Sequence, residues 1–353
     1  MNPLLNMIDL AGVIHLHSSY SFDGRAPLGE IIGAAHRCGC DFLMLTDHST
    51  LQARQEGWEG RHGRTLLVVG EEIAPRFNHY LAFGHREPIG TVDLPPQACI
   101  DRVSSAGGMG FIAHPDHEGT ALFHVKHYPW TDWSVAGYTG LGIWDFMTDW
   151  QNSLRSYPRA VLSYLFPALF LRGPSAATLA RWDALTQRRP VTGIGELDNH
   201  DTPMRFAGIT LSVFPFARVL RLIRTHLLVP PLTGEAGTDI AALLSALKLG
   251  RAYVSLDYYR SASGFSLSLA EGEQCRTLGG TFELGREAVL RVRLPHPGRV
   301  RIIRNGALFH QTTGTDLTAV VREPGVYRAE AALRVFGRWR PWIFSNPIYV
   351  VRG

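Results

Sequence analysis

Cysteine is scarce in this chain, and the four cysteines do not have the spacing of a disulfide framework or a zinc ribbon. Cys38 and Cys40 are separated by one residue, while Cys99 and Cys275 are remote from them. We therefore expect free thiols in a reducing, cytoplasmic location. Residues 1–10 contain neither a basic segment nor a cleavage site, so we expect no secretory signal peptide.

Long apolar runs and a strong net charge are also missing. The most apolar stretch, residues 161–171, is too short to span a membrane and contains Pro167. The formal net charge of +4 over 353 residues is compatible with a small anionic ligand but does not require one. Arginines are frequent from Arg286 onwards, but aromatic residues do not alternate with them as in single-strand binders, so a nucleic-acid partner is not favoured. The oligomeric state is left open.

Short apolar runs alternate with helical patterns over the first two-thirds of the chain. Pro27 precedes apolar residues with helical spacing at Leu28, Ile31 and Ala35. Strands are predicted at residues 12–14, 41–45, 65–70, 80–84, 111–113, 141–144 and 191–195. This alternation indicates an α/β fold with a mainly parallel sheet. An aromatic-rich, largely helical insert is predicted at about residues 120–190.

The pattern changes after about residue 258. Apolar and polar residues then alternate with a period of two, and Asn305-Gly306 is a strong hairpin signal. We therefore predict a first domain over residues 1–258 and a small antiparallel β-sandwich over residues 259–353.

Histidines and acidic residues recur at the ends of the predicted strands. Eight of nine candidates follow a strand, and His79 precedes one. The nine are His15, His17, Asp23, His48, Glu72, His79, His114, Asp198 and His200. Because strand carboxyl ends build the active site of α/β barrels, we expect these side chains to converge. Six imidazoles and three carboxylates suit two or three divalent ions such as Mn²⁺, Zn²⁺ or Fe²⁺, and the lack of cysteine argues against a closed structural zinc site.

The motifs around these residues resemble those of the polymerase and histidinol phosphatase (PHP) superfamily of metal-dependent hydrolases. The similar segments are residues 15–24, 46–48, 70–73, 78–84, 113–115 and 198–200. The resemblance extends over roughly residues 12–255. The ending at residues 342–350 is similar to a branch that includes carbamate-insecticide hydrolases.

This resemblance implies a distorted (β/α)7 barrel with a trinuclear metal site, in which a bridging hydroxide attacks phosphorus or a carbonyl carbon. The implied ligand sets are His15, His17, Glu72 and Asp198; Glu72, His79 and His114; and Asp23, His48 and His200. Glu71 would lie outside the site. Asp47 is expected to orient an imidazole rather than bind metal. Apart from His117, the remaining histidines are predicted to have no role in the site. They include His85 and His226.

Three more residues are candidates for catalysis. His117 is a candidate for protonating the leaving group, and Arg25 and Arg205 for stabilising developing negative charge. The alternatives are a partly exposed loop position for His117 and a solvated surface position for either arginine.

The expected function is metal-dependent hydrolysis of a small-molecule phosphoester. Many phosphatases of this superfamily follow the His-Pro pair with an arginine, whereas Asp116 follows His114-Pro115 here. Hydrolysis of a carbamate or carboxylester therefore stays open as an alternative, as does nuclease activity.

Overall fold

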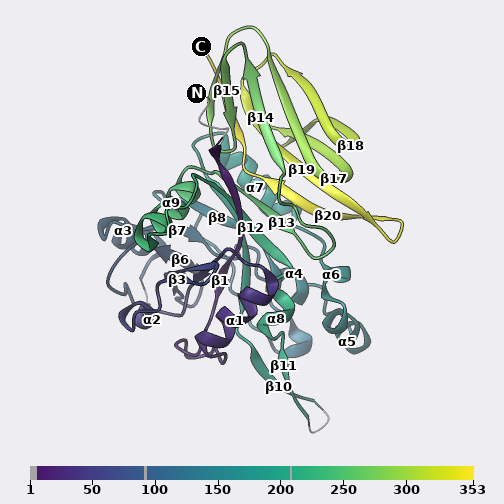
Figure 1. Ribbon diagram of the computed structural model, residues 1–353. Coiled ribbons are helices and arrows are strands. Elements are labelled where there is room, and N and C mark those ends of the chain that lie inside the picture. Colours follow the sequence, from purple (N-terminus) through teal and green to yellow (C-terminus); the bar gives the residue numbers. More distant parts are fainter. Residues whose placement is uncertain (1–5, 91–93, 207–208) are drawn as a thin grey trace. The chain divides into compact units, whose positions relative to one another are not determined.

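The computed structural model describes residues 6–90, 94–206 and 209–353, which form two compact units (Figure 1). The N-terminal unit comprises residues 11–174 and 195–224. The C-terminal unit comprises the residues up to Leu10 together with residues 175–194 and 225–353. Helices and strands are mixed, as predicted. The predicted domain boundary between residues 258 and 259 stays a prediction.

No helix within the described residues is long and apolar enough to cross a membrane.

The N-terminal unit contains most of the elements that position the candidate site. They are β1 (Ile8–Leu16), α1 (Leu28–Cys38), β2 (Phe42–Leu45), α2 (Gln52–Gln55), β3 (Gly60–His62), β4 (Thr65–Val69), β5 (Glu71–Ile73), β6 (Tyr80–Phe83), α3 (Pro96–Ser105), β7 (Met109–Ile112), β8 (Gly140–Asp145), α4 (Phe146–Gln151), α5 (Tyr157–Leu165), α6 (Pro167–Phe170), β9 (Thr192–Asn199), β10 (Thr202–Phe206), β11 (Ile209–Val213) and α8 (Phe216–Val219). Strands β1 and β9 begin in the residues of the C-terminal unit.

Strands β1, β2 and β4 pair in parallel and are almost wholly buried where they pair. Such strands have continuous apolar sequences because both faces are covered. Helix α1 begins after Pro27, ends at the left-handed Gly39 (φ 68°) and buries the predicted apolar residues. The sequence pattern therefore predicted this part of the fold well.

Strand β6 differs from the predicted, mainly parallel arrangement. It pairs antiparallel with both β5 and β7, whereas β7 and β8 are parallel. The start of an antiparallel strand lies beside the end of its neighbour, so His79, before β6, reaches Ala113, after β7. This reversal explains why His79 was the one candidate that preceded its strand.

The predicted insert contains α4, α5 and α6 in the N-terminal unit and α7 (Ala176–Thr186) in the C-terminal unit. Strand β8 also lies within the predicted range, so the insert is helical only after Asp145, apart from one 3₁₀ turn at Ala121–Phe123.

The C-terminal unit is built mainly from antiparallel strands. Its further elements are β12 (Ile223–Val229), α9 (Ala236–Lys248), β13 (Ala252–Leu256), β14 (Ser266–Glu271), β15 (Gln274–Thr277), β16 (Thr281–Leu284), β17 (Ala288–Arg304), β18 (Ala307–Val321), β19 (Gly325–Val335), β20 (Arg338–Ser345) and β21 (Ile348–Arg352). The first two residues of β12 belong to the N-terminal unit. Long strands β17, β18 and β19 lie side by side in Figure 1, and their buried residues contribute to an apolar core. Asn305 and Gly306, with φ values of 51° and 84°, form the predicted hairpin turn. The β-sandwich itself stays a prediction.

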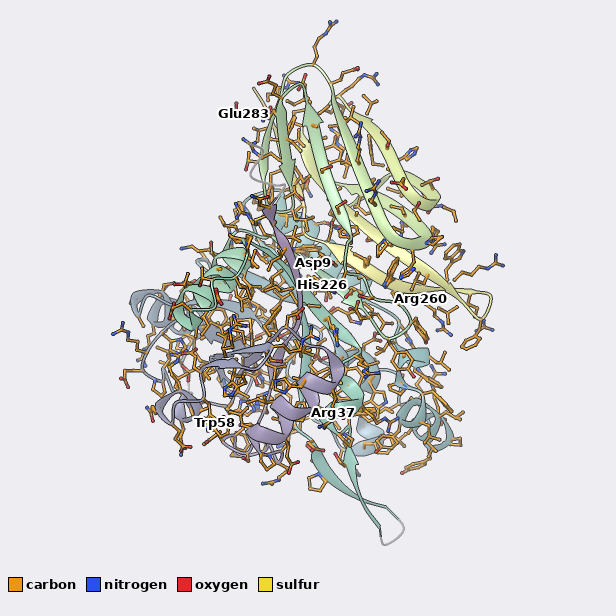
Figure 2. The ribbon with its side chains drawn as sticks, viewed as in Figure 1. Asp9, Arg37, Trp58, His226, Arg260 and Glu283 are labelled. Atoms are coloured by element: carbon orange, nitrogen blue, oxygen red, sulfur yellow. The ribbon has the colours of Figure 1, made fainter. Side chains whose placement is uncertain are left out.

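A buried polar network lies within the C-terminal unit. Figure 2 labels Asp9 and His226 close together, and Asp9 Oδ1 is 2.9 Å from His226 Nδ1. The other ring nitrogen of His226 is 3.3 Å from Asp257 Oδ2, and the Tyr253 hydroxyl donates to Asp9 Oδ2 at 2.6 Å. Each buried polar group thus has a partner, as stable cores require.

Candidate metal centre

All nine predicted ligands converge in the N-terminal unit. They form three groups in which one ligand atom from each residue lies within 4.8 Å of the others. The groups are His15, His17, Glu72 and Asp198; Glu72, His79 and His114; and His17, Asp23, His48 and His200. The first two groups match the sets that the sequence resemblance implied. The third contains the implied residues and adds His17.

Glu72 lies where the groups meet, and its two oxygens face different imidazoles. Oε2 is 3.1 Å from His15 Nε2, 3.2 Å from His17 Nε2 and 3.4 Å from His48 Nδ1. Oε1 is 2.8 Å from His79 Nδ1 and 3.3 Å from His114 Nε2. A carboxylate with this arrangement can bridge two cations, one at each oxygen.

Two further carboxylates face the same imidazoles from other directions. Asp198 Oδ1 is 3.2 Å from His15 Nε2 and 3.4 Å from His17 Nε2. Asp23 Oδ2 is 3.2 Å from His48 Nε2 and 3.3 Å from His200 Nε2. Every candidate ligand therefore directs a nitrogen or oxygen into the shared space.

Backbone hydrogen bonds join the loops that carry these side chains. The amide of His17 donates to the carbonyl of Asn199 at 3.1 Å, and the amide of Arg25 donates to the carbonyl of His200 at 3.1 Å. The amide of Ala113 donates to the carbonyl of His79 at 3.0 Å. Segments distant in sequence are thus fixed to one another beside the cluster.

Three of the nine residues have positive φ angles, which are uncommon outside glycine. The values are 69° at His15, 25° at His114 and 50° at Asp198. Such conformations cost about 1–3 kcal/mol each and persist where the surrounding structure enforces them. Their occurrence at three convergent polar residues is typical of a functional site.

Burial and mutual charge displace the pKa values in the cluster. Burial disfavours the charged form of His15, but the charges of Glu72 and Asp198 raise its pKa well above the ordinary 6.5. Burial likewise opposes protonation of His114, yet its contact with Glu72 raises its pKa to about 9. Burial alone would raise the pKa of Glu72, whereas the facing imidazoles hold it well below 4.5. The carboxylates therefore favour positive charge around them.

The donor set fits divalent metal ions better than it fits a closed hydrogen-bond network. Five ring nitrogens approach Glu72, although a carboxylate has only about four lone-pair sites. Among the described residues, neither ring nitrogen of His17 has a hydrogen-bond partner, nor does Nδ1 of His48. Buried polar atoms left without partners call for an explanation, and ligation of cations supplies one. Imidazole with carboxylate is the ligand mixture of Zn²⁺, Mn²⁺ and Fe²⁺ sites.

Glu196 is a site residue whose role the sequence did not reveal. Its Oε1 lies 3.1 Å from His15 Nδ1, and its Oε2 accepts the amide of His114 at 2.9 Å. Gly142 on β8 makes room for this carboxylate, since a Cβ at that position would collide with Glu196 Oε2. The strand of residues 191–195 pointed to Glu196 as an end residue, but nothing local indicated its partners.

The two acidic residues that precede candidate ligands behave differently from each other. Asp47 was expected to orient an imidazole, but its carboxylate accepts the amide and hydroxyl of Ser18 at 2.6 and 2.7 Å. It therefore fixes the loop after His17 through the backbone. Glu71, predicted to lie outside the site, contacts His85 Nε2 at 2.7 Å and accepts the amide of Ile89 at 2.8 Å.

His117 is buried beside the cluster, which excludes the partly exposed loop position considered from the sequence. Burial, with the nearby His114, lowers its pKa to about 4. Its Nδ1 accepts the amide of Tyr128 at 3.2 Å, so the neutral ring carries its proton on Nε2. In this tautomer, the Nε2–H of His117 is available as a hydrogen-bond donor. Its role in protonating the leaving group stays a prediction.

The structure describes the side chain of only one of the two candidate arginines. Arg25 is exposed and lines the cavity next to the cluster. Arg205 belongs to β10, but its side chain lies outside the described part of the chain. Their predicted contribution to charge stabilisation stays a prediction.

A cavity of about 1290 Å³ adjoins the cluster. Seven of the nine candidate ligands line it: Asp23, His48, Glu72, His79, His114, Asp198 and His200. The volume exceeds the roughly 300–1,000 Å³ of ordinary small-molecule sites. Among the described lining residues, Arg25 and Arg76 are the two with permanently cationic side chains. Such a site has room for a substrate larger than a simple phosphate monoester.

No family model matches the chain. No curated protein matches it either. A two-domain protein from Bacteroides vulgatus, described as containing a predicted PHP-like metal-dependent phosphoesterase, is 14% identical across 97% of this chain and 95% of its own length, with a TM-score of 0.46. A candidate metal-dependent phosphoesterase from Bifidobacterium adolescentis is 15% identical across 59% of this chain and 94% of its own, with a TM-score of 0.33. Such low sequence identities and TM-scores do not carry an activity over to this chain, so its chemistry follows from its own residues.

Proposed function

We propose that this protein is a metal-dependent hydrolase of small-molecule phosphoesters. The observation that carries the proposal is the position of Glu72, whose two oxygens face separate sets of imidazoles at the edge of a large cavity. The PHP-like motifs in the sequence support the same conclusion. We further propose the finer assignment to that superfamily, with a distorted (β/α)7 barrel, a C-terminal β-sandwich and a kinship to the carbamate-hydrolase branch.

The proposed ligands divide into three sets around two or three divalent ions. The sets are His15, His17, Glu72 and Asp198; Glu72, His79 and His114; and Asp23, His48 and His200 with His17 beside them. When bound, the ions would supply water acidified towards neutral pH and positive charge for the transition state.

The remaining contributions come from residues around the ligands. Glu196 holds the ring of His15 and the backbone of His114, which fixes the direction of two ligand nitrogens. Arg25 stands at the cavity wall, where its charge can attract an anionic ester. In the net reaction, the oxygen of water bonds to phosphorus, the ester P–O bond breaks, and the leaving alcohol takes up a proton.

Hydrolysis of a carbamate or carboxylester is the second candidate, and a specific observation favours it. A phosphate monoester dianion needs several cationic partners, but Arg25 and Arg76 alone provide permanent positive charge among the described lining residues. Asp116 also stands where many phosphatases have arginine. These features fit a singly charged phosphodiester or a neutral ester better than a dianion.

The test is a substrate panel measured on protein purified without chelator, with and without added Mn²⁺. The panel contains p-nitrophenyl phosphate, bis-p-nitrophenyl phosphate, an aryl ester and an aryl carbamate. We expect metal-dependent turnover of bis-p-nitrophenyl phosphate, which Asp198→Ala abolishes. Turnover of the carbonyl substrates alone would replace the phosphoester proposal with the second candidate.

A further inference from the structure

Helix α5 has an unusual distribution of residues for a helix in a folded protein. Its buried residue is Ser163, whereas Tyr157, Val161, Leu162 and Leu165 are 62%, 49%, 50% and 52% exposed. Amphipathic helices normally bury their apolar stripe and expose their polar residues. The apolar side chains of α5 therefore contribute little to the core, and their exposure needs another explanation.

Polar contacts hold α5 in this orientation. Trp150 Nε1 donates to the hydroxyl of Ser163 at 3.1 Å, and the hydroxyl of Tyr164 donates to the carbonyl of Ser212 at 2.8 Å. Arg218 Nη2 donates to the carbonyl of Leu165 at 3.0 Å, and its guanidinium lies over the Tyr164 ring. The helix is thus anchored by hydrogen bonds with its apolar stripe left open.

That stripe faces the cavity that contains the candidate metal ligands. Tyr157, Val161 and Leu165 are four residues apart, so they lie along one side of the helix, and all three line the cavity. With a rise of about 1.5 Å per residue, the stripe is about 12 Å long. Met147 and Trp150 of α4 extend the same apolar lining. One wall of the cavity is therefore apolar over the length of a medium alkyl chain.

We propose that the substrate carries an extended apolar substituent, which lies along Tyr157, Val161 and Leu165 while its ester group meets the His/Asp/Glu cluster. This inference rests on the proposed function, and it defines the substrate class of that site. The small number of permanent cations in the lining agrees with it, because the bulk of such a substrate is uncharged. Phe22, 78% exposed and stacked on His48, gives the ester end of the site an apolar neighbour as well.

The experiment uses p-nitrophenyl alkyl phosphates, below their micellar concentrations, in which the leaving group is constant and only the alkyl chain lengthens from ethyl to butyl to octyl. We expect kcat/KM to rise by roughly twofold per methylene, less than full burial would give because the stripe is partly open. A p-nitrophenyl phenyl phosphate arm distinguishes an aryl substituent from an alkyl chain. Turnover that depends on Mn²⁺ but not on chain length would overturn the inference and leave the proposed function intact.

Leu165→Gln and Leu162→Gln form a matched pair, because both leucines lie on α5 with 52% and 50% exposure, but only Leu165 is among the cavity-lining residues. Leu165→Gln should flatten the dependence of kcat/KM on chain length, and Leu162→Gln should preserve it. An unchanged dependence in Leu165→Gln would refute the inference. So would an equal reduction in both variants, which would mean that the exposed helix acts as a general surface.

Binding provides a readout that does not need turnover. Alkylphosphonates cannot be hydrolysed at an ester bond, and their affinity for the Mn²⁺-loaded protein can be measured by calorimetry. We expect affinity to rise with chain length in the wild type and in Leu162→Gln, and to rise less in Leu165→Gln. If no phosphate ester were hydrolysed, the proposed function would fail while this series still decided whether the apolar wall binds alkyl groups.

Discussion

The N-terminal and C-terminal units both bury histidine among carboxylates, but they satisfy these groups in different ways. In the C-terminal unit, His226 directs one ring nitrogen to Asp9 and the other to Asp257, and Tyr253 donates to the second oxygen of Asp9. In the N-terminal unit, several imidazoles compete for the oxygens of Glu72, and neither ring nitrogen of His17 has a hydrogen-bond partner among the described residues.

This difference separates a structural polar network from a candidate binding site. A network that stabilises a fold pairs each donor with an acceptor, since an unpaired buried polar group costs about 1–3 kcal/mol. A cluster that leaves several ligand atoms facing one space gives up part of that stability. Functional sites commonly lose stability in return for activity. Substitutions in the Glu72 cluster should therefore reduce activity more than stability, and substitutions of buried charges in the C-terminal unit should reduce stability more than activity.

The largest effect is expected for Glu72→Gln. The amide has nearly the same shape but cannot bridge two cations, so we expect metal content to fall and turnover of bis-p-nitrophenyl phosphate to drop by at least about a thousandfold. The free energy of unfolding of the metal-free protein should change little by comparison. Elemental analysis, kinetics and urea denaturation measure the three quantities. Unchanged metal content would contradict the bridging role.

Asp183→Ala should have the reverse effect. In the C-terminal unit, both oxygens of Asp183 accept from the buried guanidinium of Arg328, at 2.6 and 2.8 Å. Removing one partner leaves a buried charge poorly compensated, and Glu330 can replace only part of the interaction. We expect a loss of roughly 3 kcal/mol in the free energy of unfolding, measured with urea, and no change in metal content.

The control for this prediction is Asp316→Ala. Asp316 pairs with Arg293 at 3.4 Å, but both side chains are mostly exposed. Solvent screens such a pair, so its removal should leave the unfolding transition where it is. If Asp183→Ala were as mild as Asp316→Ala, the buried Asp183–Arg328 pair would not be a source of stability for the C-terminal unit.

The sequence predicted the candidate site better than it predicted the supports of either network. The ligand residues stand in short motifs at strand ends, where local spacing is informative. The contacts of Glu196 with His15 and of Asp9 with His226 join residues 181 and 217 positions apart, so no local pattern encodes them. The reversal of β6 escaped prediction for the same reason, because strand direction depends on which neighbour a strand pairs with.

Helix α5 shows a second limit of pattern analysis. The sequence predicted that this segment is largely helical, and the structure exposes three apolar residues of the helix along the cavity. Hydrophobic periodicity identifies the helix but not the surface against which it lies. The orientation of α5 is determined by hydrogen bonds of Ser163 and Tyr164, whose partners lie elsewhere in the chain.

The His226 network should give the C-terminal unit a pH-dependent stability of similar size to the effect of Asp183→Ala. Burial opposes protonation of His226, but Asp257 and Asp9 raise its pKa to about 9 from an ordinary value of 6.5. A raised pKa in the folded state contributes stability that is complete below pH 6.5 and is lost as the pH rises through about 9.

We therefore expect the stability advantage of the wild type over His226→Gln to shrink by roughly 3 kcal/mol between about pH 6 and about pH 10. Urea denaturation of both proteins at each pH measures this difference, and the comparison cancels the titration of lysines and other tyrosines. Because Tyr253 also contacts Asp9, Tyr253→Phe distinguishes loss of the His226 charge from loss of the tyrosine proton. An advantage that stayed constant with pH would mean that folding does not raise the pKa of His226.

The smallest effect, and the finest test of the comparison, concerns two buried glutamates with similar contacts. Glu196 and Glu71 each contact an imidazole nitrogen and accept a backbone amide. The imidazole partner of Glu196 is the candidate ligand His15, whereas that of Glu71 is His85, outside the cluster. Glu196→Gln should weaken Mn²⁺ binding by about 10–100-fold, because the amide oxygen can accept from only one of the two donors that the carboxylate serves. Glu71→Gln should leave Mn²⁺ affinity close to that of the wild type.

Excess Mn²⁺ should restore much of the kcat of Glu196→Gln if Glu196 acts by positioning the ligands. Equal Mn²⁺ affinities in the two variants would mean that the contacts of Glu196 with His15 and His114 do not contribute to metal binding.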